Sequence, residues 1–532
     1  MDILLITTAF IFGFTVKQLG LPPLVGFLAA GFALNIFGVE TTETLHKLSD
    51  IGITLLLFSI GLKVKLKKLF APQILGTTSL HMIITVVVLG SVIYGLSLTG
   101  LSFFKTLNLN TSLLIAFALS FSSTVFAVKI LEEKGEISSK HGGIAIGILV
   151  VQDMFAVIFI TLTSGKIPSI LAVGLVALFF LRKPLTVLMD RSGHGELLVL
   201  LACILPIAGA GAFEYVGLKP DLGALILGML LAGCPKSDEM AKAMFGFKDM
   251  FLVGFFLTIG MAELPNIEML GIAVLLVCFV PFKSILFFKL LTRFSLRART
   301  ALQTSMNLAN YSEFGLIVGA ICVSQGLIGS EWLVIIAVAL SISMIAASPV
   351  ASQTNRIYSR WNSFFKNFET NTRLPGDDII DIGDATIAVF GMGRVGTSVY
   401  DNLRKRYGKR VIGLDSNEEN VEYHVKKDRM VAHGDAADYD FWQRGSSSPQ
   451  QINLVFLAMS HAANIVAAKS VSELPQIPKL AATVRYNDEI EPLKKAGVNF
   501  VFDIFDEAGK GFSNHVCEMI ETKNQHADFD KN

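Results

Sequence analysis

A succession of long apolar runs fills the first two thirds of the chain and constrains its fold more than any other feature. Backbone N–H and C=O groups in hydrocarbon must be satisfied within their own segment, so apolar runs of this length predict transmembrane helices. The composition agrees, with 52% hydrophobic and 17% charged residues. We predict a polytopic α-helical membrane domain, residues 1–358, with thirteen spans at about 3–17, 22–38, 47–62, 74–97, 111–130, 141–163, 167–189, 195–213, 219–234, 243–262, 266–290, 300–324 and 331–355.

Basic residues in the loops predict the orientation of these spans. If the C-terminal region is cytoplasmic, thirteen spans place the N-terminus outside, and the run at Ile3 is expected to be a retained first span. The inner loops then collect twenty Lys and Arg residues. Such an excess is typical of cytoplasmic loops. The outer loops collect only Lys47, Lys105, Lys166 and Lys219.

Two short segments of the membrane domain recur in the same order. Gly20–Gly26 returns as Gly217–Gly223, and Phe58–Leu62 returns as Leu257–Met261. The members of each pair lie seven spans apart, and an odd separation reverses the orientation of a repeat. The pattern therefore predicts inverted repeats, which are an architecture of secondary transporters.

One carboxylate lies deep inside an apolar run. Asp153 is flanked by Ile148–Val157, and an ionised carboxylate at that depth costs about 2.5–3.5 kcal/mol on insertion scales. Asp153 can bind a proton, or it can bind a dehydrated monovalent cation, so it is a candidate exchange site. Its neighbour Gln152 cannot titrate, which leaves one exchangeable carboxylate. The alternative is a structural Asp that caps a broken helix or pairs with a basic residue.

Polar interruptions occur at corresponding places in the two repeats. The fifth run contains Ser122, Ser123 and Thr124, and the twelfth contains Asn310 and Glu313. Irregular backbone at membrane depth is tolerated only where it faces protein or a water-filled cavity. We therefore predict two unwound helices that cross near the midplane beside Asp153. The alternative for the serines is back-bonding to their own helix.

Two further ionisable residues fall within the predicted spans. Lys283 either extends to the inner surface or supplies a positive charge to the crossing. Glu313 is then either the partner of Lys283 or the balance to a helix end.

The chain changes character after the last apolar run. Residues 359–384 form a polar, charged stretch that we predict to be a linker, and residues 385–532 have the composition of a soluble domain. Ala385–Phe390 is a buried-strand pattern, and a predicted helix extends to about Tyr407. Gly391, Gly393, Arg394 and Gly396 lie at the turn between them, which is the arrangement of a nucleotide-binding Rossmann domain.

An acidic residue follows the second predicted strand of this domain. Asp415 suits ribose hydroxyls and disfavours a 2′-phosphate, so AMP or NAD(H) is the expected nucleotide. Val431–Ala436, which contains Asp435, ends a third predicted strand. No hydride-transfer constellation is evident. We therefore expect a nucleotide sensor rather than a dehydrogenase, and no enzyme activity.

These motifs together resemble the Kef-type potassium:proton antiporters over nearly the whole chain. The shared features are the Gln152–Asp153 pair, the Ser-Ser-Thr break, the Ser-Glu-Phe element at Glu313 and the GxGRxG domain, which looks like a potassium-transport nucleotide-binding (RCK) domain. Asp153 falls on the family's transport carboxylate and Gln152 on its neighbour. Gly391, Gly393, Gly396 and Asp415 fall on its nucleotide contacts, and Arg485 falls on a basic residue that holds glutathione in gated members.

The resemblance implies a homodimer in the lipid of a bacterial inner membrane that exchanges K⁺ for H⁺. It also implies a bound nucleotide and leaves open glutathione as a regulator and a cytoplasmic ancillary subunit. It implies no nucleic-acid partner and no metal beyond the transported K⁺. The residues leave three alternatives: a Na⁺/H⁺ antiporter, a ligand-gated potassium channel and a membrane-anchored NAD-dependent enzyme. The inverted repeat and the absence of a TVGYG-like filter argue against a channel.

Overall fold

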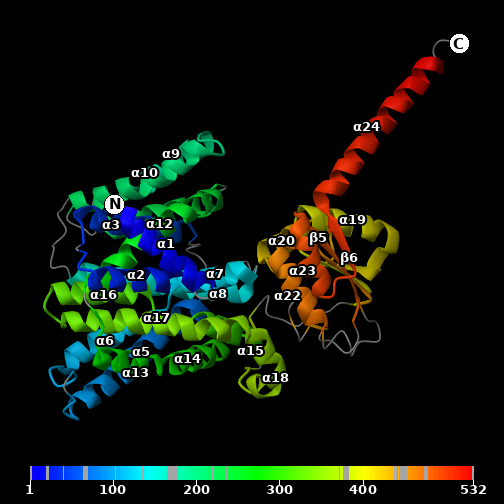
Figure 1. The fold of residues 1–532 in the computed structure, drawn as a ribbon. Coiled ribbons are helices and arrows are strands. Elements are labelled where there is room, and N and C mark those ends of the chain that lie inside the picture. The colour runs from blue at the N-terminus through cyan, green and yellow to red at the C-terminus, as the bar shows by residue number, and fades with distance from the viewer. Residues whose placement is uncertain are drawn as a thin grey trace. The chain divides into compact units, whose positions relative to one another are not determined.

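The chain divides into two compact units (Figure 1), whose residues are Met1–Val128, Ile144–Thr354 and Ser363–Asn371 in the first, and Lys129–Gly143, Asn355–Asn362 and Thr372–Asn532 in the second. The computed structural model describes residues 3–529, except 19–22, 40, 64–69, 102, 135, 138, 164–177, 217–219, 235, 263, 371, 375–382, 437, 439–440, 443–451 and 473–476. Some predicted features lie outside the described residues: the starts of both Gly-containing repeat segments, the loop at Lys65–Lys68, Lys166, and the first part of the span at 167–189.

Helices coincide with each predicted apolar run. Five helical segments of the described chain are long and apolar enough to cross a membrane, and shorter apolar helices accompany them. The number of spans, thirteen, stays a prediction. The helices are α1 (Ile3–Gln18), α2 (Pro23–Ile36), α3 (Glu43–Lys63), α5 (Pro72–Ser97), α6 (Leu109–Ser120), α7 (Thr124–Lys134), α8 (Lys140–Thr163), α9 (Leu178–Arg191), α10 (Glu196–Tyr215), α11 (Pro220–Leu231), α12 (Ser237–Ala262), α13 (Ile267–Val277), α14 (Val280–Arg293), α15 (Ala298–Asn307), α16 (Glu313–Ser324), α17 (Ser330–Ser352) and α18 (Thr354–Lys366).

The two predicted breaks are observed. Helix α6 ends at Ser120, and Phe121 has extended backbone (φ −69°, ψ 151°) before α7 begins at Thr124. Helix α15 ends at Asn307, and α16 begins at Glu313 with Ser312 as its cap, because the Ser312 hydroxyl accepts a hydrogen bond from the Phe314 N–H. Both runs are therefore pairs of half-helices with irregular backbone between them.

Glycine contacts between helices repeat in the two halves of the first unit. A Cβ atom added at Gly61 of α3 would lie 2.9 Å from Gly228 Cα of α11, and one added at Gly260 of α12 would lie 2.8 Å from Gly31 Cα of α2. Only glycine permits helix backbones to approach so closely. The exchange of partners between the halves, α3 with α11 and α2 with α12, is the relation expected of the predicted inverted repeat.

The beginning of the predicted linker is helical and packed. Residues 359–366 are the end of α18. Phe365 and Phe368 then lie edge-on to Phe288 of α14, with ring centroids 5.5 and 5.7 Å apart. The Ala298 N–H at the start of α15 donates to Glu369 Oε1 over 2.9 Å. The prediction of a polar, charged linker does not hold for this first stretch, because its aromatic residues bury apolar surface on the first unit.

The second unit contains a parallel sheet of β1 (Ile387–Phe390), β2 (Val411–Asp415), β3 (Val431–His433), β4 (Leu454–Leu457), β5 (Lys479–Val484) and β6 (Phe500–Asp503). The order β3-β2-β1-β4-β5-β6 is that of a doubly wound Rossmann fold, as predicted. Its helices are α19 (Arg394–Tyr407), α20 (Glu418–Val425), α22 (His461–Ser472) and α23 (Ile490–Lys495), and α24 (Ile504–Phe529) extends away from the sheet (Figure 1). This order brings the ends of β1, β2 and β4 together at one edge.

Candidate functional site

The two broken helices of the first unit are bonded to each other at their breaks. The Ser122 hydroxyl donates to the Leu308 carbonyl over 2.8 Å, and the Ser123 N–H donates to Asn310 Oδ1 over 2.7 Å. These residues are buried, so the bonds satisfy backbone groups that no helix satisfies there. The predicted crossing is therefore observed, and the back-bonding alternative is wrong for Ser122.

Asp153 of α8 lies at this crossing with one oxygen unbonded. Thr124 Oγ1, in the first turn of α7, donates to Asp153 Oδ2 over 3.2 Å. Asp153 is 1% exposed, and its Oδ1 atom has no hydrogen-bond partner in the part of the chain that the structure describes. A buried carboxylate oxygen without a donor is costly unless a proton or a cation binds it. Asp153 therefore has the chemistry of an exchange site.

Gln152 has a different role from its neighbour. Its Oε1 atom accepts a hydrogen bond from the Ser122 N–H over 3.0 Å, and its Nε2 atom donates to the Ser120 carbonyl over 3.5 Å. The amide thus contacts the last residue of α6 and the break that follows it. An amide can donate and accept at once, which an ionised carboxylate cannot do.

Lys283 of α14 is directed into the crossing and is 1% exposed. Its ammonium group donates to the carbonyls of Leu119, Phe121 and Asn310 over 3.0, 2.8 and 3.0 Å. The first two carbonyls lie at the C-terminal end of α6, where a helix carries partial negative charge. The alternative in which Lys283 extends to the surface is therefore wrong, and its charge stabilises the crossing.

Glu313 is the first residue of α16 and is also buried. The Ser123 hydroxyl donates to Glu313 Oε2 over 2.9 Å, and the Ser312 hydroxyl lies 3.5 Å from the same atom. A carboxylate at a helix N-terminus faces the positive end of the helix dipole. This geometry matches the second expectation for Glu313, the balance to a helix end.

Two residues of the crossing were not predicted as site residues. Asn310 joins the two breaks, and its place within the polar interruption was the available signal. Tyr311 lies beneath Lys283 Nζ, which is 4.7 Å from the ring centroid, and its N–H donates to the Ser343 hydroxyl over 3.0 Å. Ser343 is one of several serines in the apolar helix α17, and the sequence does not single it out.

The glycines of the Rossmann motif allow three segments of the second unit to meet. Gly391 has φ +88°, and a Cβ atom there would lie 2.7 Å from the Ala458 carbonyl oxygen after β4. Gly396 packs against the Gly391 carbonyl, which leaves no room for a side chain. Asp415, at the end of β2, accepts hydrogen bonds from the N–H groups of Met392 and Asn417, each over 2.8 Å. Its carboxylate thereby links β1 to β2.

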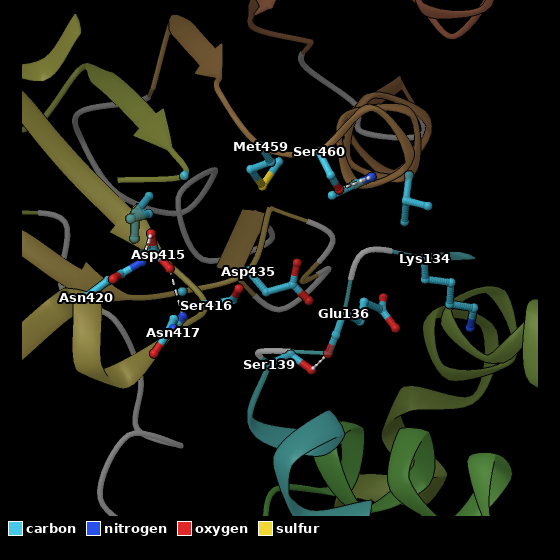
Figure 2. Close-up of a pocket in the computed structure, with 15 residues that line it drawn as sticks. Lys134, Glu136, Ser139, Asp415, Ser416, Asn417, Asn420, Asp435, Met459 and Ser460 are labelled. Atoms are coloured by element: carbon cyan, nitrogen blue, oxygen red, sulfur yellow. Dashed lines mark hydrogen bonds between the residues drawn. The ribbon is translucent and has the colours of Figure 1, made fainter. Parts of the chain in front are cut away.

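A cavity of about 240 Å³ lies at this edge of the second unit (Figure 2). Asp415 and Asp435 line it beside Gly391, as predicted from the strand ends. Gly393, Arg394, Gly396 and Arg485 do not line it, and the Arg394 and Arg485 side chains are exposed. Asp415 and Asp435 therefore meet at one cavity, after the neighbouring strands β2 and β3.

The cavity also receives the segment between α7 and α8, which sequence reasoning did not connect with the nucleotide domain. Lys134, Glu136 and Ser139 line the cavity (Figure 2). Lys140, at the start of α8, forms an ion pair with Glu418 of α20, with Nζ 2.5 Å from Oε1. Nothing in the local sequence could have signalled this contact, because the partners are 278 residues apart.

Comparison with protein families assigns both parts of the chain. The model of the sodium/hydrogen exchanger transmembrane family matches residues 5–353. The model of the TrkA-N domain matches residues 387–503. The first match includes the crossing with Asp153 and Lys283, and the second includes the glycine motif with Asp415.

Three similar proteins align with nearly the whole of this chain. A putative K⁺ efflux antiporter KefB of Alkalimonas amylolytica is 26% identical over 98% of this chain and 82% of its own. A putative cation/proton antiporter YbaL of Escherichia coli K12 is 26% identical over 97% and 95%. A glutathione-regulated potassium-efflux system protein KefC of Klebsiella pneumoniae is 24% identical over 90% and 78%. The chain therefore belongs to the sodium/hydrogen exchanger family, and it is a multi-pass monovalent cation/proton antiporter with a C-terminal regulatory TrkA-N domain rather than an enzyme.

Proposed function

We propose that this antiporter exchanges K⁺ for H⁺ and that Asp153 binds each in turn. The observation that carries the proposal is the unbonded, buried Oδ1 atom of Asp153 at the meeting point of the broken helices. A proton on this carboxylate removes its charge, and a dehydrated cation balances it. One carboxylate that must hold one or the other couples the two fluxes.

The surrounding residues supply the remaining requirements of such a site. Thr124 orients the carboxylate through its hydroxyl. Lys283 and Glu313 are held by hydrogen bonds at opposite kinds of helix end, so their charges belong to the scaffold rather than to the exchange. Gln152 holds the α6–α7 break. We propose that these residues, with Ser122 and Ser123, keep the crossing rigid while Asp153 changes its occupant.

Potassium is proposed over sodium because two of the similar proteins are named as potassium-efflux systems. The full chain in proteoliposomes with an internal pH dye tests the choice. We expect K⁺ gradients to drive proton flux and equal Na⁺ gradients to drive much less. A larger response to Na⁺ identifies the chain as a Na⁺/H⁺ antiporter, which is the alternative ion assignment.

A nucleotide is the proposed ligand of the cavity in the second unit. Asp415 and Asp435 line the cavity and would hold ribose hydroxyls. A phosphate would then extend past the lining residues to the N-terminus of α19, which follows the glycine motif. Calorimetry with AMP, NADH and NADPH on the purified full chain tests this, with AMP or NADH expected to bind more tightly than NADPH, because an acid at the end of β2 disfavours a 2′-phosphate.

The α7–α8 segment offers a route for regulation. Lys140–Gly143 belong to the second unit, and the same helix α8 carries Asp153 in the first. We propose that nucleotide occupancy acts on transport through this helix. Deletion of residues 385–532 is then expected to leave exchange intact and release it from nucleotide control. Exchange that still responds to AMP after the deletion contradicts this route.

The assembly proposed for the protein is a homodimer in the bacterial inner membrane. The edge strand β6 exposes Phe500 and Phe502, and α24 exposes Phe505 and Phe512. Exposed apolar side chains on an edge strand and an adjacent helix fit contact with a second copy. Cross-linking between single cysteines placed in α24 tests the dimer. Glutathione binding at Arg485 and an ancillary subunit remain proposals from the resemblance, to be tested by pull-down and by calorimetry with glutathione.

A further inference from the structure

Helix α5 carries a line of buried polar side chains that the exchange site does not include. Thr77, His81 and Thr85 follow each other at intervals of four residues, so they lie on one face of the helix. They are 0%, 0% and 1% exposed. The opposite face of α5 is apolar and exposed, with Ile83 at 61% and Val87 at 55%. The polar line therefore faces the protein and the apolar face is the one suited to lipid.

None of these polar groups is satisfied within the part of the chain that the structure describes. The hydroxyls of Thr77 and Thr85 and both ring nitrogens of His81 are buried without a hydrogen bond. A threonine in a helix ordinarily donates to the carbonyl four residues earlier, and Thr78 does so, to Ile74 over 2.7 Å. Buried polar groups without protein partners are commonly satisfied by internal water.

The line leads to the depth of the exchange site. The His81 ring stacks on Phe287 of α14 with centroids 3.4 Å apart and an angle of 8°. Phe287 is one helical turn from Lys283, whose ammonium group lies at the crossing. Thr77 lies near the Pro72 end of α5, and Thr85 is about 12 Å further along the helix. The three groups thus span roughly half of the 30 Å hydrocarbon core.

The helices around α5 leave few other titratable groups at this place. Helix α6 contains none, and α14 contributes Lys283. Helix α8 packs on α5 where Ile74 would meet a Cβ atom at Gly147, and it contributes His141 near its start and Asp153 six residues beyond Gly147. His81 is seven residues beyond Ile74, so helix geometry places His81 and Asp153 at similar depth, since both segments rise about 10 Å.

We propose that Thr77, His81 and Thr85 form a proton path along α5 that runs from its Pro72 end, past the depth of Asp153, to Thr85. Hydroxyl groups donate and accept hydrogen bonds, and imidazole can accept a proton at one nitrogen and release a proton from the other. The path consumes nothing, because each proton that enters through water leaves toward the crossing. This inference rests on the proposed exchange at Asp153 and adds the route by which its proton arrives.

Substitutions that keep shape and remove polarity test the path. His81→Phe keeps a ring to stack on Phe287, and Thr77→Val and Thr85→Val keep the volume. Thr78→Val is the matched control, because Thr78 is equally buried and its hydroxyl is already bonded within the helix. Wild type, the four variants and Asp153→Asn are reconstituted as full chains in proteoliposomes, and cation-driven proton flux is measured across pH.

We expect His81→Phe, Thr77→Val and Thr85→Val to lower the maximal flux roughly tenfold at alkaline pH, where protons are scarce. The KM for the cation stays unchanged, and the variants become more sensitive to replacement of H₂O by D₂O. Thr78→Val stays near wild type. Wild-type flux in all three path variants overturns the path alone, as does an equal loss in Thr78→Val or a change confined to the cation KM. Wild type without exchange, or active Asp153→Asn, overturns the proposed function and the path with it.

Discussion

The backbone N–H of Ser122 donates a hydrogen bond to Gln152 Oε1 over 3.0 Å, within the break that also contains the contact to Asp153. Gln152 is thereby committed to the scaffold, since its Nε2 atom also reaches the Ser120 carbonyl. Asp153, the next residue, keeps its Oδ1 atom unbonded among the described residues. Two adjacent side chains of similar size therefore have different roles. Gln152 holds the broken helix in place, and Asp153 can bind a proton or a cation.

Asp153→Asn is expected to reduce cation-driven proton flux to the background of empty vesicles. An amide keeps the size of the side chain but does not titrate, so it cannot bind and release a proton during transport. Flux is measured in proteoliposomes with an internal pH dye. Asp190→Asn, the same change at the exposed end of α9, is the control and is expected to behave as wild type. Near-normal flux in Asp153→Asn would show that another group carries the exchange.

Gln152→Asp is expected to make transport sensitive to membrane potential. Exchange of one cation for one proton at a single carboxylate moves no net charge, so wild-type flux should not respond to an imposed potential. A second carboxylate adds a titratable charge and also removes the bond to Ser120. The measurement is flux at several imposed potentials, with Gln152→Met separating the lost bonds from the added charge. Strong voltage dependence in the wild type contradicts the single-carboxylate mechanism.

Lys283→Met is expected to destabilise the first unit strongly. Three carbonyl groups lose their donor, and each buried group left unsatisfied costs about 1–3 kcal/mol. The thermal unfolding temperature of the purified protein in detergent is the measurement. Lys289→Met, at an exposed position of the same helix, is the matched control and should unfold at the wild-type temperature. If Lys283→Met unfolds at the wild-type temperature, the Lys283 ammonium group does not stabilise the crossing as proposed.

Asp415→Ala is expected to weaken AMP binding by about 1–3 kcal/mol, because ribose hydroxyls lose a buried acceptor. Asp415 also accepts from the Met392 and Asn417 N–H groups. Asp415→Asn keeps one acceptor oxygen, so we expect it to lose less affinity for AMP than Asp415→Ala does. Calorimetry on the full chain provides the affinities, with Asp488→Asn as an exposed control. If wild type binds no nucleotide below millimolar concentration, the domain is a dimerisation scaffold rather than a sensor.

The ion pair of Asp401 and Arg429 predicts a pH dependence for the second unit. Two hydrogen bonds of 2.8 Å from the Arg429 guanidinium hold the pKa of the Asp401 carboxyl below its usual value. A pKa lowered by folding contributes stability above the unfolded value of about 3.9, and this contribution is lost as pH falls through the folded value. Asp401→Asn is expected to unfold at a lower temperature at neutral pH and to approach wild type in acid. The measurement is the thermal unfolding temperature of residues 384–532 between neutral and acid pH. A difference between wild type and Asp401→Asn that stays constant across this pH range contradicts the prediction.

The amino-acid sequence by itself predicted the elements of this protein. Apolar runs predicted the helices because lipid offers no hydrogen-bond partners, so the backbone of a spanning segment must satisfy its own N–H and C=O groups. The polar interruptions at Ser122 and Asn310 predicted both breaks, because irregular backbone at membrane depth is tolerated where it faces protein or a water-filled cavity. The glycine motif predicted the Rossmann turn, because only glycine fits at Gly391 and Gly396. Each of these conclusions rests on a local rule, so a sequence pattern suffices to reach it.

The tertiary structure alone decided what each polar residue contacts. It separated the scaffold role of Gln152 from the unbonded oxygen of Asp153, and it directed Lys283 to three carbonyls. It placed Glu136 at the cavity beside Asp415 and stacked His81 on Phe287. These contacts join residues far apart in the chain. Their geometry depends on how whole helices pack, and hydrogen bonding varies over fractions of an ångström that no periodicity in the sequence encodes.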